Sequence, residues 1–96
     1  MIDINNIIFK RNDLTPDERI LYAYIIKDLE VAIFNNTKDE DGYYWYYTNE
    51  ELTNLLGCSK SKLIKMKKRL EEKGLIKQKR ELGGKTKYFA YEGGEV

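Results

Sequence analysis

Basic residues cluster in one block of this chain, and that block is where side chains could do chemistry. Residues 59–80 hold 10 Lys/Arg and 2 Asp/Glu, a net charge of +8. Residues 1–58 hold 5 Lys/Arg and 11 Asp/Glu, a net charge of −6, so the overall charge of +1 conceals a strong asymmetry. A confined cationic block attracts polyanions. Nucleic acid is therefore the first partner to consider.

Other kinds of chemistry lack the residues that they need. The chain has one cysteine, Cys58, and no histidine, so it can form no internal disulfide and no typical zinc site. No pair of nucleophile and base is visible. We therefore expect no enzyme activity, no metal and no cofactor. The free thiol fits a cytoplasmic protein, and no apolar run is long enough to predict a membrane span.

The cationic block begins with a predicted helix, from about Ser59 to Lys73. Ser59 can cap its first turn, and a glycine follows its last residue. Leu63, Met66 and Leu70 fall on one stripe, at positions i, i+3 and i+7, which can face a core. Most of the lysines fall outside this stripe, so the opposite face of the helix is cationic.

A shorter helix is predicted just before the cationic one. The segment Thr48-Asn49-Glu50-Glu51 has the spacing of a capping box, which marks the start of a helix. Three leucines then share one face, and only Gly57-Cys58 separates the two helices. Two short helices joined by a glycine turn are typical of a helix-turn-helix. We expect Cys58 to pack in that turn as a small apolar residue.

Two strand-like segments follow the cationic helix and predict a β-hairpin. Residues 75–80 and 85–91 flank a turn at 81–84 with two glycines, which suit a positive φ. Strand alternation puts Lys85 and Lys87 on one face and Thr86 and Tyr88 on the other. A hairpin in this place is the wing of a winged helix. We expect Lys85 and Lys87 to bind DNA, with Lys85 at the tip contacting the backbone or the minor groove.

The first half of the chain supplies the remaining elements. Thr15, a proline and Glu18 form a helix start, and helical periodicity predicts a helix over 16–34. Residues 35–42 are predicted to be a polar loop and the five aromatics of 43–47 one short strand. This aromatic strand could stack on single-stranded bases or seal the core. We favour the core, because a capped helix follows at once.

These elements predict an α+β fold: a winged helix-turn-helix with three helices, a short strand and a C-terminal β-hairpin wing. One domain would span residues 1–92, and residues 93–96 would form a flexible tail or a truncated linker.

In a helix-turn-helix, the second helix enters the major groove with its first residues at the base edges. Short hydroxyls and long cations occupy that first turn here, and they can reach phosphates or guanine. A lysine-rich helix face is often only a solvated surface. The confinement of positive charge to this one block favours sequence-specific binding of double-stranded DNA. The predicted DNA-binding residues are Ser59, Lys60, Ser61, Lys62, Lys65, Lys68, Lys85 and Lys87.

Three segments resemble the N-terminal domain of the RepA-type plasmid replication initiators of Gram-positive bacteria. The resemblance covers residues 14–91, and the segment before it has no clear match to the start of that family. The segments that carry it are Tyr46-Tyr47-Thr48-Asn49-Glu50-Glu51-Leu52, Leu55-Leu56-Gly57-Cys58-Ser59-Lys60 and Leu70-Glu71-Glu72-Lys73-Gly74-Leu75-Ile76.

The resemblance implies a winged helix that binds repeated origin sequences (iterons) of a plasmid or related mobile element, often as a dimer. Its partners would be double-stranded DNA, a second copy of the chain, and host or element-encoded replication proteins. Two alternatives stay open. A transcription regulator would use the same surface on operator DNA. A protein-interaction module would need an apolar patch on the exposed face of the third helix, the cationic one.

Overall fold

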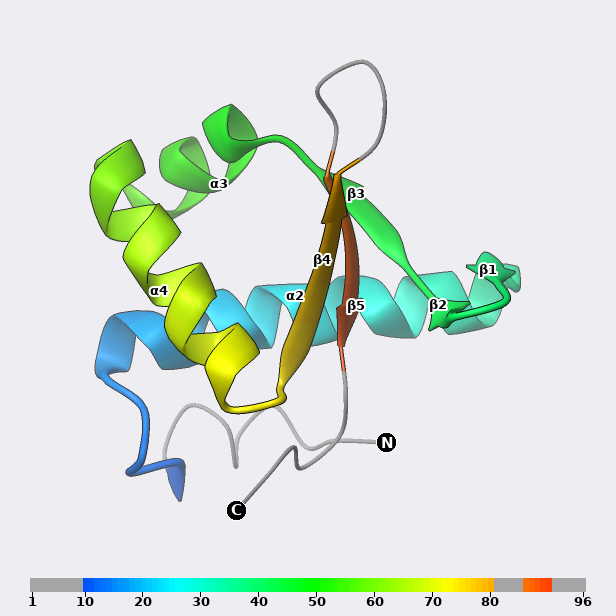
Figure 1. Cartoon of the computed structure of the whole chain (residues 1–96), viewed down its shortest axis with the longest axis horizontal. Helices are drawn as coiled ribbons and strands as arrows, with labels where there is room; N and C mark the ends of the chain where they lie inside the picture. Colours follow the sequence, from blue (N-terminus) through cyan, green and yellow to red (C-terminus); the bar gives the residue numbers. More distant parts are fainter. Residues whose placement is uncertain (1–9, 81–85, 91–96) are drawn as a thin grey trace.

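The computed structural model describes residues 10–80 and 86–90, which contain three long or medium helices and five short strands (Figure 1). The elements are α2 (Pro16–Asn35), β1 (Lys38–Asp39), β2 (Gly42–Tyr43), β3 (Trp45–Tyr47), α3 (Asn49–Leu56), α4 (Lys60–Glu72), β4 (Ile76–Arg80) and β5 (Thr86–Ala90). None of the helices described is both long and apolar enough to cross a membrane.

Helix α2 is the platform on which the other elements pack, and it confirms the helix predicted over 16–34. It begins at the expected capping box, in which the Thr15 hydroxyl accepts from the Glu18 backbone and the Glu18 carboxylate accepts from Thr15. It ends where Asn36 adopts a left-handed conformation, with φ of 56°. Figure 1 shows α2 behind a small sheet, with α3 and α4 toward one end and the β1–β2 hairpin at the other.

The aromatic run differs from its prediction as one strand. Strand β2 pairs with β1 as a small hairpin that spans most of the predicted loop and takes in Tyr43, the first of the five aromatics, and only Trp45–Tyr47 forms β3. The reversal is local: Gly42 has a φ of 125°, and the Asp39 carboxylate accepts from the backbone N–H of Asp41 at 2.8 Å. Such short-range side-chain bonds to the backbone favour turns. Tyr47 is 4% exposed and packs in the core, as the core-sealing interpretation requires.

The three-stranded antiparallel sheet has the order β3-β5-β4. Tyr88 of β5 lies opposite Trp45 on one side and Gln78 on the other. The predicted hairpin is therefore present as β4 and β5, and the α+β winged-helix arrangement is confirmed. The predicted turn at 81–84, Lys85 and the tail at 93–96 lie outside the described residues.

Candidate nucleic-acid interface

The helix-turn-helix has the predicted form. Helix α3 starts at a capping box between Thr48 and Glu51 and ends at Gly57, whose φ of 63° is a left-handed conformation that suits glycine. Cys58 completes the short connection and is partly buried against the core. Ser59 then begins α4, and its hydroxyl accepts from the backbone N–H of Lys62 at 3.2 Å.

Helix α4 is fixed to the body of the protein by its apolar stripe and by a partly buried ion pair. Leu63, Met66 and Leu70 are buried in the core cluster, as their spacing predicts. Arg69 also donates to the Glu18 carboxylate, with Nε and Oε2 2.6 Å apart. Glu18 is only 2% exposed, and it is the same side chain that caps α2. The start of α2 and the last turns of α4 are therefore held together by a single carboxylate.

The opposite face of α4 carries the predicted interface residues. The side chains of Lys60, Ser61, Lys65 and Lys68 are exposed. Within residues 10–80 and 86–90, none of the three lysines has an ion-pair partner. Burial of the apolar stripe leaves these side chains facing solvent, where a polyanion could approach.

Lys62 is exposed on the same helix, but it is already paired. Its ammonium donates to a carboxylate oxygen of Asp17, in the first turn of α2. This hydrogen bond, with the attraction between the two charges, raises the pKa of Lys62 above its ordinary value. A phosphate can reach Lys62 only in competition with Asp17.

Lys87 was predicted to bind DNA from the wing, but its side chain is not open to solvent. It is 8% exposed. Its ammonium donates to Asp39 Oδ2 at 2.7 Å and lies 4.2 Å from the centre of the Tyr44 ring. This hydrogen bond lowers the pKa of Asp39 below its ordinary value. The β1–β2 hairpin thus covers Lys87, and we leave this residue out of the candidate interface.

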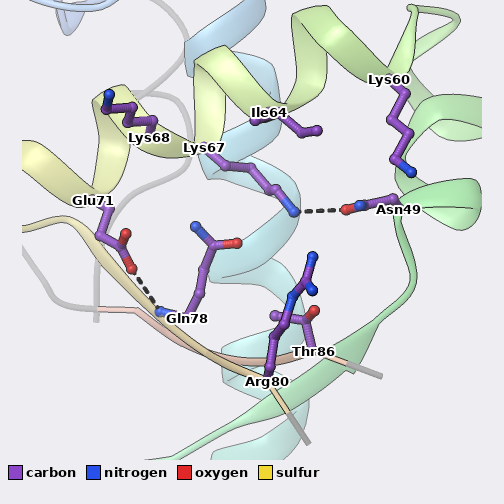
Figure 2. A pocket seen from close by; sticks show the side chains of 9 residues that line it. All are labelled: Asn49, Lys60, Ile64, Lys67, Lys68, Glu71, Gln78, Arg80 and Thr86. Atoms are coloured by element: carbon purple, nitrogen blue, oxygen red, sulfur yellow. Dashed lines mark hydrogen bonds between the residues drawn. The ribbon is translucent and has the colours of Figure 1, made fainter. Parts of the chain in front are cut away.

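A groove of about 390 Å³ lies between α4 and the β4–β5 hairpin (Figure 2). Its basic lining residues are Lys60, Lys67 and Lys68 from α4 and Arg80 from β4. The acidic residue that lines it, Glu71, accepts from the backbone N–H of Gln78 at 3.0 Å. The walls of the groove therefore carry an excess of positive charge.

Lys67 forms part of the groove and was missed in the sequence analysis. It is 6% exposed, and it donates to Asn49 Oδ1 at 2.6 Å and to the Tyr88 hydroxyl at 2.8 Å. Burial lowers the pKa of Lys67 and raises that of Tyr88. A signal was present in the sequence: Lys67 lies four residues after Leu63, so helical periodicity alone puts it at the edge of the buried stripe.

A family model described as the replication initiator protein A (RepA) N-terminus matches residues 2–91. The chain belongs to this family. The match confirms the resemblance, and it also corrects its extent, because it includes most of the N-terminal segment that had shown no clear match. A search of curated proteins found no significant match.

Solved structures agree with membership of the RepA N-terminal family. One is described as the N-terminal domain of a DNA-binding protein; it is 37% identical, with a TM-score of 0.70 over 96% of this chain and 72% of its own. A second, a Rep–DNA complex, is also 37% identical, with a TM-score of 0.71 over 96% and 75%. A third, an MDR initiator, is 32% identical, with a TM-score of 0.68 over 95% and 76%.

Proposed function

We propose that this RepA-family domain binds double-stranded DNA sequence-specifically and thereby serves replication initiation. The observation that carries the proposal is the exposed cationic face of α4, continuous with a positively lined groove. The similarity to a structure described as a Rep–DNA complex supports it. We infer that neither a metal nor an enzymatic step takes part, since the interface consists of lysine, serine and arginine side chains that can bind phosphates and base edges.

The proposed complex places α4 in the major groove, which is about 12 Å wide and admits one helix. Ser59, Lys60 and Ser61 in its first turn would approach base edges and phosphates. Lys65 and Lys68 continue this face, and Lys62 would join it on release from Asp17. A backbone phosphate would bind Arg80 on the hairpin wall of the groove, which faces α4. Lys85 remains a predicted wing contact.

Membership of the family supports a proposal for the wider biological setting. We propose that the DNA sites are origin repeats of a plasmid or a related mobile element, and that host or element-encoded replication proteins join the complex. We also propose a homodimer on half-sites about 34 Å apart. Exposed apolar side chains on α2, among them Phe34 at 89% exposure, are available for pairing. Sedimentation of the domain with and without DNA tests the dimer.

The binding proposal is tested by selecting duplex sites from a random library and measuring affinity by fluorescence anisotropy. Lys65→Ala should weaken binding to the selected site by about 1–3 kcal/mol if Lys65 reads a base, with a smaller loss on random DNA. Lys27→Ala is the matched control, because Lys27 is an exposed lysine on α2, outside the interface. Failure to enrich any site would refute specific binding, and a flat salt response would refute phosphate contact.

The location of the selected sites separates initiation from transcription control. Tandem repeats in a replication origin would support the initiator role. Single operators at promoters would support a transcription regulator instead.

A further inference from the structure

Ile64 is a large apolar residue that is exposed on the surface of α4. It is 47% exposed, whereas the other large apolar side chains of the helix, Leu63, Met66 and Leu70, are buried. A β-branched residue is also a weaker helix former than lysine or alanine. Neither core packing nor helix propensity explains an isoleucine here, so its role is to be sought in what α4 contacts.

The surroundings of Ile64 are those of the proposed DNA interface. It lies one turn after Lys60 and one turn before Lys68, and all three line the groove between α4 and the hairpin. Figure 2 shows Ile64 on the α4 ribbon between these two lysines. One apolar side chain is thus framed by two cations that have no ion-pair partner among the described residues. An isolated apolar group of this size is too small for a protein-docking patch.

We propose that Ile64 determines specificity by packing against the C5-methyl group of a thymine in the major groove. The inference rests on the proposed function. Among the groups that the four bases present in the major groove, the thymine methyl is the apolar one. Lys60 and Lys68 on either side would hold phosphates or guanine, which sets the distance of α4 from the bases. Burying one methyl group between Ile64 and thymine then favours T over C at one position.

Two other roles for Ile64 make different predictions. A contact with deoxyribose would also be apolar, but it would be independent of sequence. If Ile64 had a purely structural role and covered the stem of Lys67, Ile64→Ala would lower stability and weaken binding to all DNA alike. Removal of the thymine methyl alone separates specificity from both.

The experiment uses the duplex site selected with the wild-type domain and replaces each thymine in turn by deoxyuridine, which keeps base pairing but lacks the methyl group. Replacing one thymine, or two adjacent ones, should lower the affinity of the wild-type domain by about fourfold for each methyl group removed. Ile64→Ala should bind the unmodified site more weakly and lose this difference. Lys27→Ala, which truncates an exposed side chain of α2 outside the interface, should retain it.

The outcomes distinguish the inference from the function on which it rests. If no site is selected, sequence-specific binding itself fails, and Ile64 has no base to read. If a tight site is found but no deoxyuridine weakens wild-type binding, the Ile64 assignment is overturned and the DNA-binding function stands. The same holds if the methyl effect persists in Ile64→Ala.

Discussion

The ion pair between Lys62 and Asp17 allows a direct test of how the fold limits its own interface. The two side chains are each 52% exposed, so the pair lies at the surface, where a phosphate could compete for the lysine. Asp17→Asn removes the carboxylate charge and keeps the size of the side chain. We expect Lys62 to be free in this variant and to make an additional phosphate contact.

The magnitude follows from counterion release. Each phosphate neutralised on B-DNA contributes about −0.9 to the slope of log affinity against log salt concentration. Asp17→Asn should therefore steepen the slope by about 0.9. When the salt concentration falls from about 200 to about 50 mM, the ratio of the variant's affinity to that of the wild type should rise about 3.5-fold. Adding Lys62→Ala to Asp17→Asn should abolish this change.

The assay is fluorescence anisotropy with a labelled duplex over a series of salt concentrations, with circular dichroism to verify folding. Glu40→Gln removes the same charge from the turn between β1 and β2, where Glu40 is exposed, and should leave the slope unchanged. An unchanged slope in Asp17→Asn would refute the reasoning. So would an increased slope that survives the loss of Lys62, since the effect would then come from net charge alone.

The remaining predictions concern stability. Ser59→Ala removes the N-cap of α4, and Thr48→Ala removes the N-cap of α3. Each should lower the free energy of unfolding in urea by about 1 kcal/mol. Only Ser59→Ala should also weaken DNA binding. Leu63→Ala should cost about 2–5 kcal/mol, measured in the same way, because Leu63 is fully buried. Asp39→Asn should destabilise the domain at neutral pH. Since Lys87 lowers the pKa of Asp39, the stability that this pair gives is complete above pH 3.8 and is lost as the pH falls through the lowered pKa. The difference between Asp39→Asn and wild type should therefore shrink in acid, and a constant difference would contradict this account.

Local signals in the sequence determined most of the elements and marked α4 as the candidate recognition helix. The capping boxes at Thr15 and Thr48, the Ser59 cap and the leucine stripe of α4 all depend on residues a few positions apart. Helical geometry brings such residues together whatever the rest of the chain does. The start and end of each helix, and the core face of α4, were predictable for that reason.

Only the tertiary structure decided which cations are available. Lys62 is paired with a residue 45 positions away, and Lys87 with one 48 positions away. Lys67 is bonded to Tyr88, which is 21 positions away. Periodicity tells which way a side chain points from its own helix or strand, but not which distant segment packs over it. The burial and the free charge of a lysine depend on that packing, and so the limits of the interface emerge only from the folded chain.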